Sequence, residues 1–340
     1  MRIYRQGDEG PEIHDIQRRL ASVGMTVPAP ELGRFGPATT HAVRAFQERR
    51  KLRVDGLVGP DTWGQLVEAG FRPGDRTLYL HAPPMRGDDV LDLQHKLNAL
   101  GFDAGKEDGV HRRATDRAVR EFQRNVGEVP DGVVGLHTLE ILERMRPIEG
   151  APGRSLVREA EELRAMRSSL PGQTVAIDPG VAPGAGAPDA ALALAEVLAD
   201  HLATAGAKPV LLRARGDDPT PSERARIANE LGAALCVALL VDADPDRATP
   251  ACSFFGSAAT HSPAGEHLAR LILEALEREF GGPGRTERLT VAMLRETRMP
   301  AVQVEPPAAP GGVADPIFTA RLARSITLGV ERFFRDRPSG

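Results

Sequence analysis

Cysteines and aromatic residues are scarce in this sequence of 340 residues, and long apolar runs are missing. The two cysteines, Cys236 and Cys252, lie within apolar runs, which excludes a disulfide framework and favours two buried, unreactive thiols. No stretch approaches the roughly 18 consecutive apolar residues of a membrane-spanning helix. Neither sign of charge dominates, since 43 basic residues stand against 47 acidic ones. The net charge of −4 therefore gives no reason to expect nucleic acid as a partner.

The amino terminus also lacks the apolar core of a secretory signal, since it reads M-R-I-Y-R-Q-G-D-E-G. If residue 1 is the true start, we expect a cytoplasmic protein that is peripheral at the inner face of the membrane through partners. The hydrophobic content of 41% is typical of globular proteins, and the length favours two or three domains.

Two segments near the amino terminus, 7–66 and 87–142, repeat each other in order. Each copy contains a Gln-x-x-Leu helix, an Ala-Val-x-x-Phe-Gln helix and a closing Asp-Gly-x-Val-Gly-x-x-Thr segment. The spacing of the apolar residues predicts three short helices per copy, in domains at 1–72 and 78–146. The closing segments supply the candidate ligand-binding residues, which are Asp55, Gly56, Thr62, Asp131, Gly132 and Thr138.

This pattern resembles the peptidoglycan-binding domain attached to many cell-wall hydrolases. The resemblance implies a three-helix module that docks glycan or stem-peptide parts of the wall or of its precursors. We interpret the motif residues themselves as mainly structural, with glycines at turns and Phe46, Phe122 and Trp63 in the cores.

Residues 147–171 form a Pro/Gly-rich linker with a charged helix from about Arg154 to Ser168. Strands and helices then alternate from Thr174 onward, which predicts an α/β domain at 172–336 whose sheet is covered by helices on both faces. The strands are expected near 175–177, 208–212, 235–241, 252–255 and 301–304. Expected helix caps are Asp189, Thr220, Ser262 and Asp315.

The element order and several phrases resemble the zinc-dependent N-acetylmuramoyl-L-alanine amidases of the amidase-3 type. The phrases are Val175–Gly180, R-A-R-I-A-N at 224–229 and M-P-A-V-Q-V-E at 299–305. Together with the tandem modules, they resemble the CwlM group of actinobacterial amidase homologues. That group is tied to the regulation of wall-precursor synthesis.

The resemblance also implies four groups for zinc and catalysis, and this sequence keeps one of them. Val181 stands at the first histidine, a position near Ala187 at the glutamate ligand, and Leu240 at the second histidine. The catalytic glutamate remains as Glu305, either as a relict or as a group that hydrogen-bonds a bound precursor. Since His201, His261 and His267 have the wrong spacing to rebuild the site, we expect no cofactor and no metal, with zinc only if the protein is an active amidase.

The sequence therefore predicts a non-catalytic protein that binds peptidoglycan fragments or lipid- or nucleotide-linked precursors and regulates their synthesis. By resemblance, its partners would be an enolpyruvyl transferase of wall synthesis and a serine/threonine kinase. Two alternatives remain open, an active zinc amidase with other ligands and a purely structural scaffold.

Overall fold

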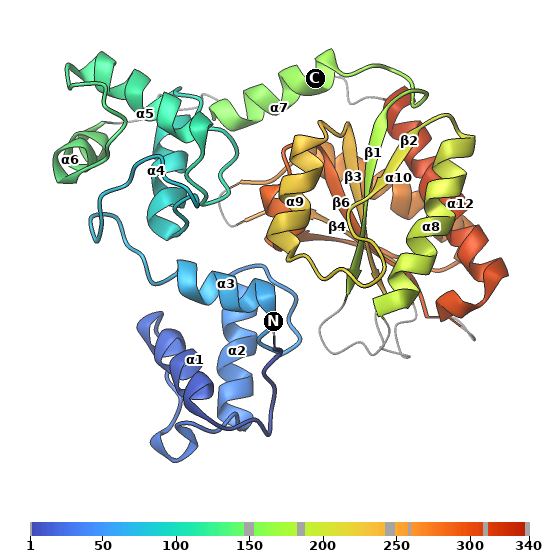
Figure 1. The fold of residues 1–340 in the computed structure, drawn as a ribbon, viewed down its shortest axis with the longest axis horizontal. Helices are drawn as coiled ribbons and strands as arrows, with labels where there is room; N and C mark the ends of the chain where they lie inside the picture. Colours follow the sequence, from blue (N-terminus) through green and yellow to red (C-terminus); the bar gives the residue numbers. More distant parts are fainter. Residues whose placement is uncertain are drawn as a thin grey trace. The chain divides into compact units, whose positions relative to one another are not determined.

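The computed structural model describes residues 2–145, 153–181, 188–241, 249–257, 260–308 and 312–336 (Figure 1). The chain divides into two compact units, one of residues 1–49 and 54–161 and the other of residues 50–53 and 162–340. No helix of the described residues is long and apolar enough to cross a membrane.

The first unit contains the two repeats, and each repeat forms three helices as predicted. The first copy consists of α1 (Pro11–Ser22), α2 (Pro37–Arg49) and α3 (Pro60–Glu68), with a short 3-10 turn η1 at Ala29–Glu31. The second copy consists of α4 (Asp88–Ala99), α5 (Arg113–Val126) and α6 (Leu136–Arg144). An isolated antiparallel bridge ties the segment before the first helix to the segment before the third in both copies, Tyr4 to Val58 and Leu78 to Val134.

A buried glutamine fixes the loop between the first two helices of each copy. In the first copy the Gln17 side chain donates to the Arg34 carbonyl and to Thr39 Oγ1, at 3.0 and 2.8 Å. In the second copy Gln94 makes the equivalent bonds to the Val110 carbonyl and to Thr115, at 3.1 and 3.2 Å. A buried amide that satisfies several backbone groups holds this loop in one conformation.

These equivalent bonds align Phe35 of the first copy with His111 of the second, because each directly follows the carbonyl that the glutamine contacts. Both side chains are fully buried. Neither ring nitrogen of His111 has a hydrogen-bond partner among the described residues. The second copy therefore carries an imidazole in a core position that an apolar ring fills in the first.

The charged helix predicted after the repeats is α7 (Arg154–Ala165), which ends earlier than expected. It contacts the second copy through an Arg158 guanidinium that lies 2.6 Å from Asp103 and a Ser155 hydroxyl that donates to Glu107 at 3.3 Å. None of its residues is fully buried.

The second unit is built on a six-stranded sheet with the order β2-β1-β3-β6-β4-β5. The strands are β1 (Thr174–Val181), β2 (Lys208–Leu211), β3 (Leu235–Val241), β4 (Ala251–Phe255), β5 (Arg285–Leu289) and β6 (Ala301–Glu305). β2, β1, β3 and β6 are parallel, whereas β4 pairs antiparallel with β6 and parallel with β5.

Helices cover both faces of this sheet, as predicted. Three of them, α8 (Pro188–Thr204), α10 (Pro263–Phe280) and α12 (Pro316–Arg335), share one apolar core with the sheet, and α12 contacts both of the others. The shorter α9 (Pro221–Glu230) and α11 (Ala292–Glu296) contact each other and the sheet from the other side. Figure 1 shows α9 on one side of the strands and α8 with α12 on the other.

Local signals placed most of the helix starts correctly. Thr220 and Glu223 form the predicted capping box, and Ser262 and Asp315 accept hydrogen bonds from the first turns of α10 and α12. The predicted cap at Asp189 is wrong, because α8 begins at Pro188 and Asp189 lies inside its first turn.

Candidate functional site

Three neighbouring parallel strands, β1, β3 and β6, end together at one edge of the sheet. Gly180 pairs with Leu240 and Val181 with Val241, while Leu239 pairs with Val304 one residue before Glu305. The structure therefore brings Val181, Leu240 and Glu305 to the same edge, where α/β proteins place their ligands. Ala187, the fourth position, lies outside the described residues.

Residues that pair in register on parallel strands point to the same side of the sheet. The paired set of Asp178, Ala238 and Gln303 therefore shares one face with Leu240 and Glu305. The alternate residues, such as Ile177, Leu239 and Val304, belong to the apolar core with α8, α10 and α12. The polar groups are thus confined to the face covered by α9 and α11.

Glu305 is the carboxylate at the end of β6, and it is 4% exposed. Gln303 donates from Nε2 to its Oε1 at 3.3 Å. Ser253 lies opposite Gln303 on β4, fully buried, and its hydroxyl has no hydrogen-bond partner in the described part of the chain. Gln303 therefore holds one oxygen of this carboxylate, and both side chains carry groups that can hydrogen-bond a ligand.

Asp178, the acid of the Asp-Pro-Gly phrase that lies within β1, is paired with Arg224 of α9. Its Oδ1 lies 2.6 Å from Arg224 Nε, and both side chains are buried. Burial raises the pKa of Asp178, and the Arg224 guanidinium opposes this change. Arg213 also approaches this end of β1, donating from Nε to the Pro179 carbonyl at 3.2 Å. Breaking a buried ion pair leaves one uncompensated charge, so Asp178 and Arg224 tie α9 to the end of β1.

The amide of Asn229 ties the other end of α9 to the chain that leads into β6. Its Nδ2 donates to the Glu296 carbonyl at 2.9 Å, and its Oδ1 accepts from the Arg298 backbone at 2.8 Å. The R-A-R-I-A-N phrase thus supports two of the strands that form the edge. The family resemblance pointed to this phrase, but the spacing of its residues does not predict which distant groups they contact.

A tetrahedral zinc site needs about three protein ligands that are imidazoles, thiolates or carboxylates. At this edge the described residues offer the carboxylate of Glu305 beside the aliphatic Leu240 and the Val181 backbone position, while the carboxylate of Asp178 is paired with Arg224. In the part of the chain that the structure describes, no group of three or more His, Cys, Asp or Glu side chains is placed to hold a metal ion. These donors do not fit zinc.

The histidines of the second unit lie elsewhere. His201 is in the last turn of α8 and contacts the Val197 carbonyl at 2.9 Å. His261 Nε2 lies 3.3 Å from Glu266, and His267 Nε2 lies 2.7 Å from the Asp336 carbonyl. Each histidine thus has a local polar contact on its own segment or on α12.

The two cysteines are free and buried, on β3 and β4. Burial, followed by the nearby carboxylates of Glu305 and Glu277, raises the pKa of the Cys252 thiol. A thiol that stays protonated is a poor nucleophile and a poor metal ligand, which agrees with the prediction of an unreactive residue.

The motif residues of the repeats form a second hydrogen-bonded glutamine network. Gln47 donates to Asp55, to the Leu57 carbonyl and to Thr62, at 2.7, 2.9 and 3.1 Å, and accepts from the Gly56 backbone at 2.9 Å. Gly56 has a positive φ of 78°, which a residue with a Cβ adopts at a cost. Hydrogen bonds among these groups therefore hold the turn in one conformation.

The second copy repeats this network with one change. Gln123 donates to Asp131 and to the Val133 carbonyl, at 2.9 and 3.1 Å, and accepts from the Gly132 backbone. Thr138 instead donates to the carboxylate of Glu128 at 3.0 Å. Among the aromatic residues, Phe46 and Phe122 are fully buried as expected. Trp63 is half-buried under the Arg19 guanidinium, 5.2 Å from its ring centroid.

Known families match both units. Residues 9–66 and 86–142 match the putative peptidoglycan-binding domain, and residues 171–308 match the N-acetylmuramoyl-L-alanine amidase family of the amidase-3 type. Fold and matches together define a peptidoglycan-related protein with two binding repeats and an amidase-like α/β domain.

Similarity to one relative extends over nearly the whole chain. N-acetylmuramoyl-L-alanine amidase CwlM of Mycobacterium tuberculosis is 32% identical over 371 residues, which cover 99% of this chain and 91% of the relative. The chain therefore belongs to the family of CwlM.

Other relatives match a smaller part of the chain. N-acetylmuramoyl-L-alanine amidase CwlL of Bacillus licheniformis is 31% identical over 157 residues, 40% of this chain and 44% of the relative. The solved structure of Ami1 from Mycobacterium smegmatis covers 50% of this chain and all of its own, with 18% identity and a TM-score of 0.42.

Proposed function

We propose that this protein is a non-catalytic amidase homologue that binds peptidoglycan fragments or lipid- or nucleotide-linked precursors and regulates wall-precursor synthesis. The observation that carries the proposal is the composition of the edge formed by β1, β3 and β6. Leu240 and Glu305 share one face there, and only the second has a ligating or proton-transferring group.

Recognition without hydrolysis needs the fold and its polar face, not the metal. Glu305 and Gln303 are buried next to each other and carry acceptors and donors suited to amide and hydroxyl groups. Sugars and stem peptides are rich in both. A buried, hydrogen-bonded pair also discriminates well, because a wrong ligand leaves its polar atoms unpaired.

A regulator of this kind acts beside the enzymes that make the precursors, and we place it in the cytoplasm. The proposed partners, carried by the family resemblance alone, are an enolpyruvyl transferase of wall synthesis and a serine/threonine kinase.

The test combines metal analysis, a digest and a titration on the full chain. We expect the purified protein to contain no stoichiometric zinc, to release no stem peptide from muropeptides, and to bind a muropeptide or a nucleotide-linked precursor in calorimetry. Glu305→Gln should weaken this binding, whereas Glu287→Gln on the exposed edge strand β5 should not. A protein that binds neither ligand would instead be a scaffold.

The second candidate is an active zinc amidase, favoured by the activity named for the matched family and for the relatives. Its metal would need ligands beyond the described residues at the edge. Stoichiometric zinc together with release of stem peptide would establish it, and a chelator should then abolish the release.

A further inference from the structure

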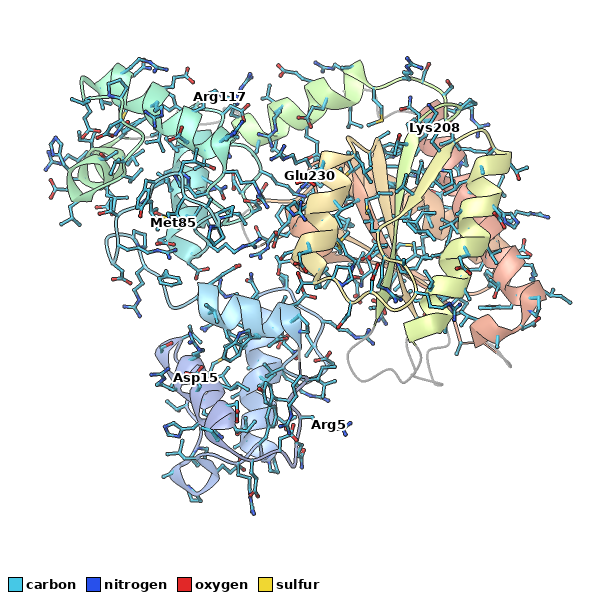
Figure 2. All side chains as sticks on the ribbon, viewed as in Figure 1. Arg5, Asp15, Met85, Arg117, Lys208 and Glu230 are labelled. Carbon is cyan, nitrogen blue, oxygen red and sulfur yellow. The ribbon has the colours of Figure 1, made fainter. Side chains whose placement is uncertain are left out.

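The outer face of α5 carries a stripe of arginines. Arg113, Arg117, Arg120 and Arg124 follow one another at i, i+4, i+7 and i+11, so they share one side of the helix. The opposite side, with Ala118, Val119 and Phe122, is buried in the module core. Arg117 is labelled on α5 in Figure 2.

Acidic neighbours compensate this stripe only in part. Asp116 lies 2.9 Å from Arg120, and Asp103 lies 3.8 Å from Arg117 while it also binds Arg158 of α7. Glu121 is on the flank of the helix. The remaining charge is spread over the twelve residues from Arg113 to Arg124, about 16 Å of helix, which is longer than a single diphosphate.

Exposed apolar side chains adjoin the stripe. Arg120 Nη1 donates to the Pro130 carbonyl at 2.9 Å, which places the stripe beside Val129, a residue 75% exposed. The same turn leads to Val133 and Leu136, of which Leu136 is 68% exposed. Leu78 and Val134 exchange backbone hydrogen bonds at 3.1 and 2.8 Å, so the exposed Tyr79 lies opposite Val133.

The first copy lacks this combination. The positions of the four arginines are occupied there by Pro37, His41, Arg44 and Glu48. Those of Tyr79, Val129 and Leu136 are occupied by Arg5, Arg53 and Pro60. Because both copies build three helices around two buried glutamines, the fold does not require this surface. Contiguous exposed apolar side chains on a folded domain mark an interaction site.

We propose that this basic-apolar surface of the second repeat, made of the arginine stripe with Tyr79, Val129, Val133 and Leu136, binds the surface of an anionic lipid bilayer. A plane of phosphates contacts all four arginines at once. The short apolar side chains and the tyrosine beside them suit the headgroup boundary, where amphipathic residues insert. Attraction to anionic lipid is short-ranged, so the local stripe acts despite the acidic net charge of the chain.

The experiment is co-sedimentation of the full chain with vesicles of phosphatidylglycerol and phosphatidylcholine in equal parts, and with vesicles of phosphatidylcholine alone. We expect binding to the first and little to the second. An arginine at an anionic surface strengthens binding roughly fivefold, so Arg113→Gln with Arg124→Gln should weaken it about 25-fold. Val129→Gln with Leu136→Gln should weaken it as well, and salt at about 1 M should release the protein.

The matched control removes two arginines from other surfaces, by Arg34→Gln with Arg278→Gln, and should bind as the unaltered chain does. The proposal is overturned if the stripe variant binds like this control, if neutral vesicles bind equally well, or if no vesicle binds. Binding to soluble polyphosphate without binding to vesicles would also overturn it and would assign the stripe to a linear polyanion.

Discussion

His111 makes the second repeat sensitive to acid, since it occupies the core position that Phe35 holds in the first. Its two ring nitrogens have no hydrogen-bond partner among the described residues. Burial lowers the pKa of His111, while the charges of Asp116 and Asp89 oppose this change. Both acids are already paired, Asp116 with Arg120 and Asp89 with Arg76 at 2.7 Å. The imidazole is therefore held neutral in the fold.

The sign of the effect follows from linkage. A histidine whose pKa is lower in the folded than in the unfolded chain binds its proton preferentially on unfolding. The free energy of unfolding therefore falls as the pH drops below the ordinary histidine pKa of about 6.5, by up to about 1.4 kcal/mol per pH unit. The loss stops once the pH passes below the lowered pKa. Between about pH 6.5 and pH 5.5, the open population of the second repeat should rise, by up to about fivefold.

The substitution His111→Phe copies the first repeat and should remove this dependence. At neutral pH it should also stabilise the second repeat by about 1 kcal/mol, because two buried polar atoms without partners disappear. Hydrogen exchange of α4 and α5, compared between the two proteins at the same pH, measures both effects. Exchange of α1 and α2 serves as the internal control, and His111→Leu guards against a poor fit of the larger ring. If the unaltered chain and both variants lose protection equally between pH 6.5 and 5.5, the reasoning is wrong.

Three further changes test the packing of each unit. Arg224→Met should lower the free energy of unfolding, measured in urea, by about 3–5 kcal/mol, because it breaks the buried ion pair with Asp178. Arg226→Met, in the exposed pair with Glu230, should lower it by less than about 0.5 kcal/mol. Gln123→Ala should lower the free energy of unfolding of the second repeat by about 2–3 kcal/mol, which hydrogen exchange of α5 would show as faster exchange. Asn125→Ala on the same helix should change the exchange little. Equal effects of the two substitutions would contradict the stabilising role of the Gln123 hydrogen bonds. Gly329→Ala should lower the free energy of unfolding by about 1–3 kcal/mol, measured by thermal unfolding, since an added Cβ would lie 2.6 Å from Ile272 Cα on α10. At Gly216 no atom lies within 4 Å of an added Cβ, so Gly216→Ala tests whether a positive φ alone destabilises the fold less.

Much of the architecture could be predicted because its signals are local. The two copies of the Phe-Gln helix and the Asp-Gly turn predicted six helices, and the Thr220 capping box fixed the start of α9 to the residue. Strands rich in valine and leucine, such as β3, were equally clear.

The missed elements lack such signals. β5 reads R-T-E-R-L, with the alternating charges of an edge strand, and α11 has only five residues. Pairs between distant segments, such as Asp178 with Arg224, depend on the packing of α9 over the sheet and not on sequence spacing. Family resemblance supplied Val181, Leu240 and Glu305 as site positions, and the strand register then brings them to one edge.

Each repeat has its own pair of glutamine networks, so its fold does not depend on the networks of the other copy. A change of exposed residues in one copy therefore leaves the fold of the other copy unaffected. The exposed residues of α5 and of the Pro130 turn can therefore differ from those of the first copy without a change in the buried glutamine contacts. Exchanging the exposed residues between the copies should transfer the proposed lipid binding to the first copy without a change in either core.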